Sequence, residues 1–210
     1  MTHIDIINFL IKENGYKSYL EIGVDTGWCF QNINCENKYC VDPYFFDNND
    51  AVRTEAQIPS FLTWRMTSDE MFDTVAKDMK FDIIFIDGMH TEEFAGRDII
   101  NSLKHLNKGG RIVVHDCIPA SYGAQLVPRV QCEWNGDVWK AITMLKTQGI
   151  EFSVVDTDYG CGIIEYRDNP QQLVCFEKSA YSYHDLMTDR NNILNVITVQ
   201  DFIKRYRKTE

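Results

Sequence analysis

A short apolar run that breaks at two glycines constrains the fold of this chain more than any other feature. Residues 19–22 form the run and include Glu21, and Gly23 and Gly27 follow it with Asp25 between them. Glycine lets a backbone turn tightly and approach a ligand closely, and the first N–H groups of a following helix are free to bind one. The pattern predicts a strand followed by a nucleotide-binding turn, although an ordinary strand-to-turn glycine pair has the same spacing.

A second acid follows the next apolar segment. Residues 38–41 predict a short strand, and Asp42 and Pro43 come directly after it, about 20 residues beyond Glu21. In nucleotide-binding α/β folds, a carboxylate at this distance binds the ribose hydroxyls. The alternative is that Asp42 only starts a turn before Pro43.

The next part of the chain repeats the order of strand and helix. Residues 61–66 predict a strand. Residues 67–70, which include Ser68 and Asp69, carry a helix N-cap signature just before the apolar residues Met71, Phe72 and Val75. A strand, a cap and a helix therefore follow one another again.

Two further strands end in polar residues. Residues 81–86 are the most apolar segment and predict a central strand buried on both faces, with Asp87 and Gly88 at its end. Residues 111–116 predict another strand, which ends in His115 and Asp116. Because parallel strands place their carboxyl ends at one edge of the sheet, we expect these polar residues to lie at the edge where ligands bind.

Apolar spacing and turn residues predict three helices. They span residues 4–14, 92–106 and 136–148. Residues 108–110 are expected to end the second helix, which turns four apolar side chains inward: Phe94, Ile99, Leu103 and Leu106.

The remaining segments predict loops, a hairpin and a tail. Residues 45–57 read as a loop with an irregular helix, and residues 117–134 as a lid or acceptor-binding loop. Residues 151–156 and 160–166 predict an antiparallel hairpin, because the turn between them is too short for a crossover. Residues 170–208 predict a mostly helical tail.

These elements predict a doubly wound α/β fold with a mostly parallel seven-stranded sheet, a terminal antiparallel hairpin and a helical C-terminal extension. We expect one catalytic domain over residues 1–168, with residues 169–210 packed on it as the extension. The extension is expected either to cover the site or to form a homodimer.

Composition narrows the possible partners. The 210 residues carry a formal charge of −10, which argues against binding long nucleic acid, because that affinity comes from Lys and Arg. No apolar run approaches the ~20 residues of a membrane span, and the first residues do not resemble a signal peptide. The seven cysteines show no C-x-x-C spacing and read as reduced thiols. We therefore expect a cytoplasmic protein that acts on a small or neutral acceptor.

The sequence resembles the class I S-adenosylmethionine-dependent methyltransferases over nearly its whole length. The residues that carry the resemblance are 21–27, Asp42-Pro43, 67–69 and 86–90. Within that class, residues 87–90 and 109–116 resemble a subfamily associated with glycan and natural-product O-methylation. Residues 134–139 and 191–195 are also similar to bacterial and viral members of it.

The resemblance implies a role for each matched position in binding S-adenosylmethionine. The glycine turn would line the methionine end, the next acid would bind the ribose, and the N-cap residues would lie beside the adenine. The strand-end residues would face the sulfonium and the acceptor. In chain order these positions are Glu21, Gly23, Asp25, Gly27, Asp42, Pro43, Ser68, Asp69, Asp87, Gly88 and His90.

Related metal-dependent O-methyltransferases hold a divalent cation with an Asp after the fourth strand and an acidic or Asp-Asn pair after the fifth. Asp87 and Asp116 match the first two ligand positions, and Cys117 stands at the third. Mg²⁺ prefers oxygen ligands and keeps several waters, so two carboxylates could suffice. The resemblance thus implies Mg²⁺ or Mn²⁺ at Asp87 and Asp116, with one oxygen ligand fewer than in the relatives.

Methylation of an alcohol needs a group that accepts its proton. His90 and His115 lie at strand ends, and a histidine with an ordinary pKa near 6.5 can act as a general base. His115, His90 and Asp116 are therefore the candidate catalytic residues, although each histidine could instead be a hydrogen-bonded loop residue. Three other histidines lie outside the strand ends and are predicted to be structural or exposed: His3, His105 and His184.

The leading functional hypothesis is metal-assisted transfer of a methyl group to a hydroxyl of a sugar in a glycan. Aromatic residues could build the acceptor wall, or could simply belong to the core: Tyr122, Trp134, Trp139 and Tyr159. A small phenolic or natural product is the second acceptor, and a non-catalytic cofactor-binding module is an alternative of another class. A dehydrogenase is disfavoured, because the G-x-G-x-x-G pattern would need glycine where Asp25 and Trp28 stand.

Overall fold

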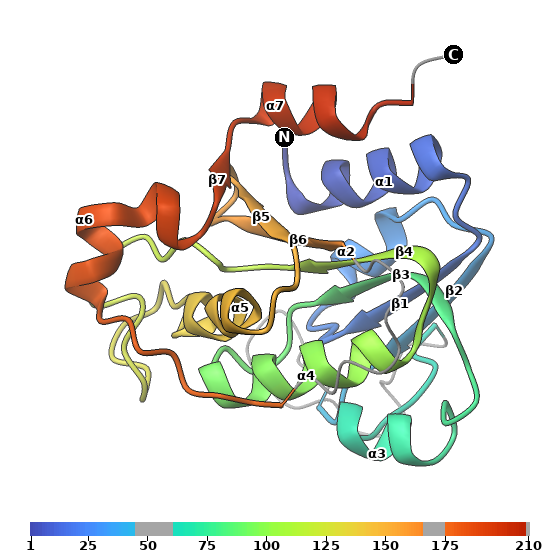
Figure 1. Ribbon diagram of the computed structural model, residues 1–210. Coiled ribbons are helices and arrows are strands. Elements are labelled where there is room, and N and C mark those ends of the chain that lie inside the picture. The colour runs from blue at the N-terminus through green and yellow to red at the C-terminus, as the bar shows by residue number, and fades with distance from the viewer. Residues whose placement is uncertain (45–60, 166–174, 209–210) are drawn as a thin grey trace.

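The computed structural model describes residues 1–44, 61–165 and 175–208. Its centre is a seven-stranded sheet in the order β2-β1-β3-β4-β6-β5-β7 (Figure 1). Four strands pair in parallel: β1 (Ser18–Ile22), β2 (Asn37–Val41), β3 (Phe81–Ile86) and β4 (Leu106–Val114). The other three complete the sheet: β5 (Phe152–Val155), β6 (Cys161–Glu165) and β7 (Val196–Ile197).

The predicted fold class is confirmed by the strand pairing. β6 runs antiparallel to both β4 and β5, as the predicted hairpin requires, and β7 is parallel to β5. The switch point of this sheet lies between β1 and β3. From β1 the chain adds β2 on one side, and it then adds β3 and β4 on the other side. In doubly wound sheets, ligands bind at the carboxyl ends of the strands at this switch point.

Helices cover both faces of the sheet. In Figure 1, α1 (His3–Asn14) and α7 (Val199–Tyr206) lie side by side on one face, and α4 (Glu92–Lys104) and α5 (Val138–Thr147) lie on the other. The shorter helices are α2 (Trp28–Asn32), α3 (Ser68–Asp73) and α6 (Tyr183–Ile193).

The alternating side chains of β3 explain why the core has two halves. Ile83 and Phe85 pack in the cluster that includes α1 and α7, whereas Ile84 and Ile86 pack in the cluster that includes α4 and α5. All four side chains are buried, as a central strand with apolar residues on both faces requires.

Local signals set the helix ends that the sequence predicts. Thr67 and Glu70 form a reciprocal capping box at the start of α3, and Thr2 and Asp5 form another at the start of α1. Gly15 ends α1 in the left-handed conformation.

The predicted strand over residues 61–66 is wrong. The segment makes a single parallel bridge, between Val41 and Trp64, and β7 from the tail supplies the seventh strand instead. The ladder stops there because the backbone N–H of Tyr44, which would continue it, donates to Oδ1 of Asp42 at 2.9 Å.

The predicted end of the helix before β4 also needs correction. α4 ends at Lys104, and Leu106 is the first residue of β4, where its buried side chain belongs to the sheet. Ile99 and Leu103 are buried as predicted, but Phe94 is 42% exposed and lies under the guanidinium of Arg97. Val75, predicted on the apolar face of α3, lies beyond the end of that helix and is also exposed.

The tail packs along the sheet and both helical layers. Its strand β7 joins the sheet edge, and α7 packs beside α1 through contacts that include Phe9 and Phe202. The predicted loop over residues 45–57 and the predicted domain boundary at residue 168 lie outside the described residues. None of the helices that the structure describes combines the length and apolar character needed to cross a membrane.

Candidate active site

Three strand ends meet at the carboxyl edge of the sheet. Gly23 N–H donates to the carbonyl of Val41, Asp87 N–H to that of Ile22, and His115 N–H to that of Ile86. These bonds continue the parallel pairing one residue beyond each strand. They place the glycine turn, Asp87 and His115 side by side, as predicted for this edge.

The glycine turn needs glycine at its first position. Gly23 has φ +85°, and a Cβ there would lie 2.2 Å from the carbonyl oxygen of Asp87. Gly27 has φ +79° and starts α2, and the ring of Phe61 occupies the space that a Cβ would fill. Asp25 also has a positive φ, of 46°. The turn is therefore held tightly against the end of β3.

Asp42 binds the backbone of this turn. Its Oδ2 accepts from Val24 N–H at 2.7 Å and more weakly from Asp25 N–H at 3.4 Å. Burial raises the pKa of Asp42, and these hydrogen bonds oppose the shift. The structure thus contains the turn that the alternative interpretation expected, including the exposed Pro43 that follows. Ribose binding by Asp42 remains a prediction.

Glu21 presents a buried carboxylate atom without a partner. The side chain is 1% exposed, and Oε2 accepts a hydrogen bond from the Tyr19 hydroxyl. Oε1 has no hydrogen bond within the part of the chain that the structure describes. Burial raises the pKa of Glu21 to about 8. An unpartnered buried oxygen of this kind is destabilising unless a ligand satisfies it.

The residues predicted to lie beside adenine turn toward α4. The hydroxyl of Ser68 donates to Oδ1 of Asp98 at 2.5 Å. Asp69 pairs with Arg97 and accepts from Asn101 Nδ2 at 3.0 Å. Both side chains therefore join α3 to α4, and an adenine contact stays a prediction. A Cβ at Gly88 would lie at ordinary contact distance from Asp98 of α4 and Ile22 of β1.

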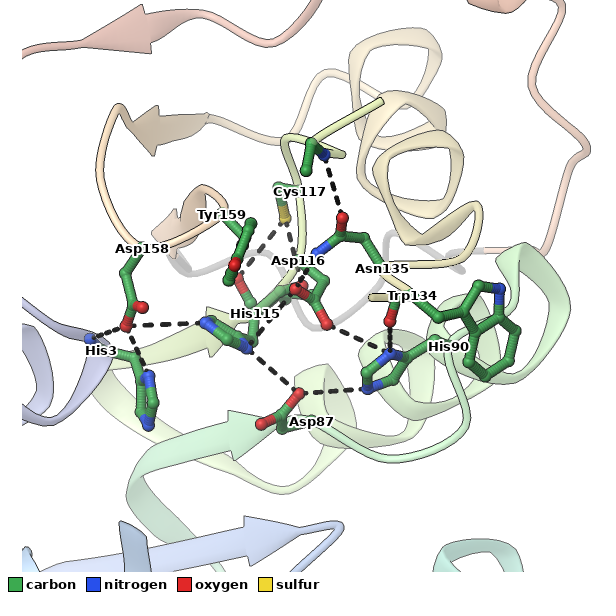
Figure 2. A network of polar contacts seen from close by, with 12 residues as sticks. His3, Asp87, His90, His115, Asp116, Cys117, Trp134, Asn135, Asp158 and Tyr159 are labelled. Carbon is green, nitrogen blue, oxygen red and sulfur yellow. Dashed lines mark hydrogen bonds and ion pairs between the residues drawn. The ribbon is translucent and has the colours of Figure 1, made fainter. Parts of the chain in front are cut away.

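Figure 2 shows the polar network at the strand ends. Asp87 Oδ1 lies 3.4 Å from His90 Nε2 and 3.3 Å from His115 Nδ1. His90 Nδ1 is 3.1 Å from Asp116 Oδ2 and also contacts the carbonyl of Trp134 at 3.0 Å. The predicted catalytic residues and metal ligands are thus neighbours, and one oxygen or nitrogen of Asp87, His90 and Asp116 could converge on a cation.

Asp116 is fixed by its backbone and by Asn135. Its φ is +60°, a conformation that favours short polar residues, and its side chain is buried. Asn135 Nδ2 donates to Asp116 Oδ1 at 2.6 Å. Asn135 is itself buried. It lies at the end of the loop after β4 and joins that loop to Asp116 through this hydrogen bond.

Carboxylates shift the pKa values of both histidines upward. Burial alone would lower them, but Asp87 and Asp116 raise the pKa of His90 to about 9. Asp87, Asp158 and Asp116 raise that of His115 to about 11. The same histidines hold the pKa of Asp87 below its ordinary value despite burial, whereas burial raises the pKa of Asp116. Both pKa values lie above the ordinary 6.5, so in the arrangement described both rings hold their proton at neutral pH, and a general-base role for either histidine stays a prediction.

The aromatic candidates separate into core and site. Trp139 is fully buried and belongs to the core. Trp134 stacks on His90 with 5.4 Å between ring centroids, whereas Tyr122 and Tyr159 are exposed. Cys117 is fully buried and its thiol points at the carbonyls of Val114 and His115, so it does not replace the missing oxygen ligand.

Three residues of the network escape prediction from the sequence. Asn135 lies within residues 134–139, which carry part of the family resemblance, so this motif was the signal that could have identified it. Asp158 gave no local signal, and His3 was placed among the structural or exposed histidines. His3 N–H and Nδ1 both contact Asp158 Oδ2, at 2.7 and 2.6 Å, and Asp158 faces His115.

Comparison with known proteins agrees with this geometry. Residues 20–117 match a family model described as a methyltransferase domain. This chain carries a methyltransferase domain. The match begins in β1 and ends just beyond Asp116, so it contains the glycine turn and the strand-end cluster. No curated protein matches the chain.

Solved structures share the fold of this methyltransferase at low identity. A putative O-methyltransferase from Klebsiella pneumoniae has a TM-score of 0.54 and 15% identity, over 79% of this chain and 80% of that one. The O-methyltransferase TomG from Streptomyces achromogenes, solved with S-adenosylmethionine, has a TM-score of 0.55 and 14% identity, over 79% of each chain. An O-methyltransferase from Bacillus cereus, solved with S-adenosylhomocysteine, has a TM-score of 0.54 and 12% identity, over 78% and 80%.

The edge of the methyltransferase sheet fits S-adenosylmethionine. At Gly23 and Gly27 the glycine turn leaves no room for a side chain. Glu21, in the strand that leads into the turn, offers Oε1 as an acceptor that has no hydrogen bond among the described residues. The reaction class is therefore methyl transfer from this cofactor, in which the sulfonium supplies an electrophilic methyl group.

Proposed function

We propose that this methyltransferase transfers the methyl group to a hydroxyl of a sugar in a glycan. The observation that supports a hydroxyl acceptor is the cluster of Asp87, His90, His115 and Asp116 beside the glycine turn. The choice of a sugar rests on the resemblance to the subfamily associated with glycan O-methylation. A hydroxyl must lose a proton as its oxygen attacks, and a neutral amine need not. Carboxylates and imidazoles at the point of attack suit the oxygen acceptor.

The residues at this edge divide between cofactor and acceptor. We assign Glu21, Gly23, Asp25 and Gly27 to the methionine end of S-adenosylmethionine, Asp42 and Pro43 to the ribose, and Ser68 and Asp69 to the adenine side. Gly88 lies between these groups and Asp87. Asp42 can bind the turn and a ribose together, because each carboxylate oxygen accepts more than one hydrogen bond.

Asp87 and Asp116 supply oxygen ligands that suit Mg²⁺ or Mn²⁺, and His90 lies between them. Such a cation would stabilise the developing charge on the acceptor oxygen and oppose the carboxylate field that holds the histidines protonated. The chain itself orients the acceptor through Asp116, which Asn135 holds, and through His90, which stacks on Trp134. Alignment of acceptor and methyl group contributes much of the rate.

A phenolic or natural-product acceptor is the second candidate. TomG acts in tomaymycin synthesis by its name, and all three neighbours in fold named above are called O-methyltransferases. The exposed Tyr122 and Tyr159 would stack equally well on a phenolic ring or on the apolar face of a sugar. A non-catalytic binding module is the remaining alternative, and the assembled strand-end cluster argues against it.

Cofactor binding is the first test. We expect calorimetry to show micromolar binding of S-adenosylhomocysteine and no binding of NAD, with separate titrations in Mg²⁺ and in EDTA. Absence of S-adenosylhomocysteine binding in both conditions would refute the cofactor assignment.

Acceptor use is the second test. Release of S-adenosylhomocysteine should be measured with deoxyhexosides, glycan fragments and phenolic compounds. We expect Asp116→Ala to abolish transfer while cofactor affinity stays within about twofold, and an exposed control, Asp78→Asn, to behave as wild type. Preference for phenols over every sugar would favour the second candidate, and full activity of Asp116→Ala would remove the role of this strand end.

A further inference from the structure

A second group of metal-ligating atoms shares His115 with the strand-end cluster and takes its other two residues from other elements. His3 is the first residue of α1, His115 follows β4, and Asp158 lies in the turn between β5 and β6. One nitrogen of each imidazole and one oxygen of Asp158 lie within 4.8 Å of one another. Figure 2 shows the three side chains converging on the side of His115 that faces away from Asp87.

The two ring nitrogens of His115 face different partners. Nδ1 lies 3.3 Å from Asp87 Oδ1. Nε2 is buried and has no hydrogen bond among the described residues; it forms an ion-pair contact with Oδ2 of Asp158 at 3.6 Å, beyond hydrogen-bond length. A bound cation would give this nitrogen a partner at bonding distance, next to a carboxylate that can bind the same ion.

This arrangement has the form of a metal-bound histidine. Metal-ligating histidines commonly place the second nitrogen against a carboxylate, which fixes the tautomer and the ring orientation. Here Asp87 lies at that second nitrogen. The first nitrogen faces His3 and Asp158.

The geometry points to a transition-metal site of two imidazoles and one carboxylate, at His3, His115 and Asp158. We infer that it binds Zn²⁺ or a cation of similar preference, because imidazole nitrogen suits zinc whereas Mg²⁺ prefers oxygen. Three protein ligands leave a fourth position for water. The site does not depend on the acceptor proposed for the methyltransferase.

The three side chains can reach such a cation with small movements. Ligand atoms around tetrahedral zinc lie about 3.3 Å apart, given bonds of about 2.0–2.1 Å. His3 and Asp158 already touch through their 2.6 Å contact, and His115 must approach by rotation of its ring. Side-chain exposures of 19% for His3 and 23% for Asp158 leave a route for the ion from solvent.

The proposed ion has a consequence for the reaction edge. Bound at Nε2, it leaves the proton of His115 on Nδ1, where the ring donates toward Asp87. His115 would then orient Asp87 and could not remove the acceptor proton. The ion would also fasten the first turn of α1 and the β5–β6 turn to the end of β4.

A structural role without metal is the competing explanation. Asp158 Oδ2 accepts from His3 N–H as well as contacting Nδ1, so these bonds alone could dock α1 on the β5–β6 turn. That explanation predicts loss of stability on mutation but no metal affinity. The two explanations therefore separate in a binding experiment.

The test is titration of the chelator-stripped full-length protein with Co²⁺, followed by competition with Zn²⁺. Excess Mg²⁺ is present to fill sites made of oxygen ligands. The protein also carries Cys132→Ser and Cys175→Ser, so that the exposed thiols cannot bind Co²⁺. We expect one equivalent of Co²⁺ with the visible spectrum of nitrogen and oxygen ligands, displaced by Zn²⁺ at micromolar concentration. No binding tighter than about 1 mM would overturn the site.

Matched variants locate the ligands. His3→Gln and Asp158→Asn should each weaken Zn²⁺ binding by at least about tenfold, whereas His184→Gln, at an exposed histidine on α6, should leave it unchanged. Far-UV circular dichroism checks that each variant is folded, and either folded variant suffices for the comparison. Unchanged affinity in a folded His3→Gln or Asp158→Asn protein would overturn the three-ligand site.

Discussion

Asn135 donates a 2.6 Å hydrogen bond from Nδ2 to Oδ1 of Asp116, and both side chains are buried. The amide is held in this orientation because its Oδ1 accepts from Ala120 N–H at 3.0 Å. Its backbone N–H donates to the carbonyl of Ala124. One side chain therefore ties the loop after β4 to the acid at the reaction edge.

Asn135→Ala should destabilise the protein and weaken methyl transfer. The substitution leaves the buried Asp116 without its donor, which should reduce the free energy of unfolding by about 1–3 kcal/mol. Urea unfolding measures this loss, and Asn135→Asp, which sets a second carboxylate against Asp116, should lose more. The exposed control Asn192→Ala should stay within about 0.5 kcal/mol of wild type. Equal stability of Asn135→Ala and this control would show that the hydrogen bond contributes nothing.

Gly136→Ala should be far more damaging than Gly109→Ala. Both glycines have positive φ, of 62° and 76°, so both alanines carry backbone strain of about 1–2 kcal/mol. A Cβ at Gly136 would lie only 1.6 Å from the carbonyl oxygen of His90, whereas Gly109 has no atom within 4 Å. Thermal unfolding of the two variants isolates the collision from the strain. Equal melting temperatures would mean that the turn before α5 does not press on His90.

Local patterns predicted the elements whose signals lie within a few residues. The apolar segment 81–86 became the central strand because both of its faces are buried, and the capping box of Thr67 and Glu70 starts α3 where predicted. Parallel strands end at one edge of the sheet, so the proximity of Asp87 and Asp116 could be predicted from the topology alone.

Long-range contacts explain what the sequence could not predict. His3 and Asp158 join the network only because α1 and the β5–β6 turn meet at the end of β4. β7 is two residues long, too short to show an alternation of apolar and polar residues. It is the seventh strand of the sheet, a place that was predicted for the segment 61–66. The raised histidine pKa values depend on carboxylates from separate strand ends, which spacing does not reveal.

Glu21→Gln should weaken cofactor binding more than it affects folding. At neutral pH the buried carboxyl is largely protonated, because burial raises its pKa to about 8, so a neutral amide of the same shape should fold normally. The wild-type carboxyl can still ionise beside the positively charged methionine end of the cofactor, whereas the amide cannot. We expect calorimetry to show at least about tenfold weaker binding of S-adenosylmethionine, equivalent to about 1.4 kcal/mol. Glu36→Gln, an exposed neighbour of Lys17, is the control, and equal affinities would remove Glu21 from the site.

Asp98 should make the stability of this methyltransferase fall between pH 6 and pH 8. Its side chain is 5% exposed, and burial raises its pKa to about 7 although the Ser68 hydroxyl opposes the shift. A carboxyl in the unfolded chain titrates near 3.9, so between about pH 4 and pH 7 the folded state binds a proton that the unfolded state does not. Stability is therefore greatest below about pH 4 and is lost as the pH rises through 7.

Asp98→Asn removes this titration while its amide oxygen can still accept from Ser68. For a folded pKa of about 7, wild type should lose about 1.4 kcal/mol relative to Asp98→Asn between pH 6 and pH 8, as measured by urea unfolding at both pH values. Other groups titrate in both proteins and cancel in the difference. Asp78→Asn makes the same substitution at an exposed position and serves as the control. A constant gap between wild type and Asp98→Asn would mean that Asp98 is ionised in the folded protein, and that the contact with Ser68 is a charged hydrogen bond which fastens α3 to α4.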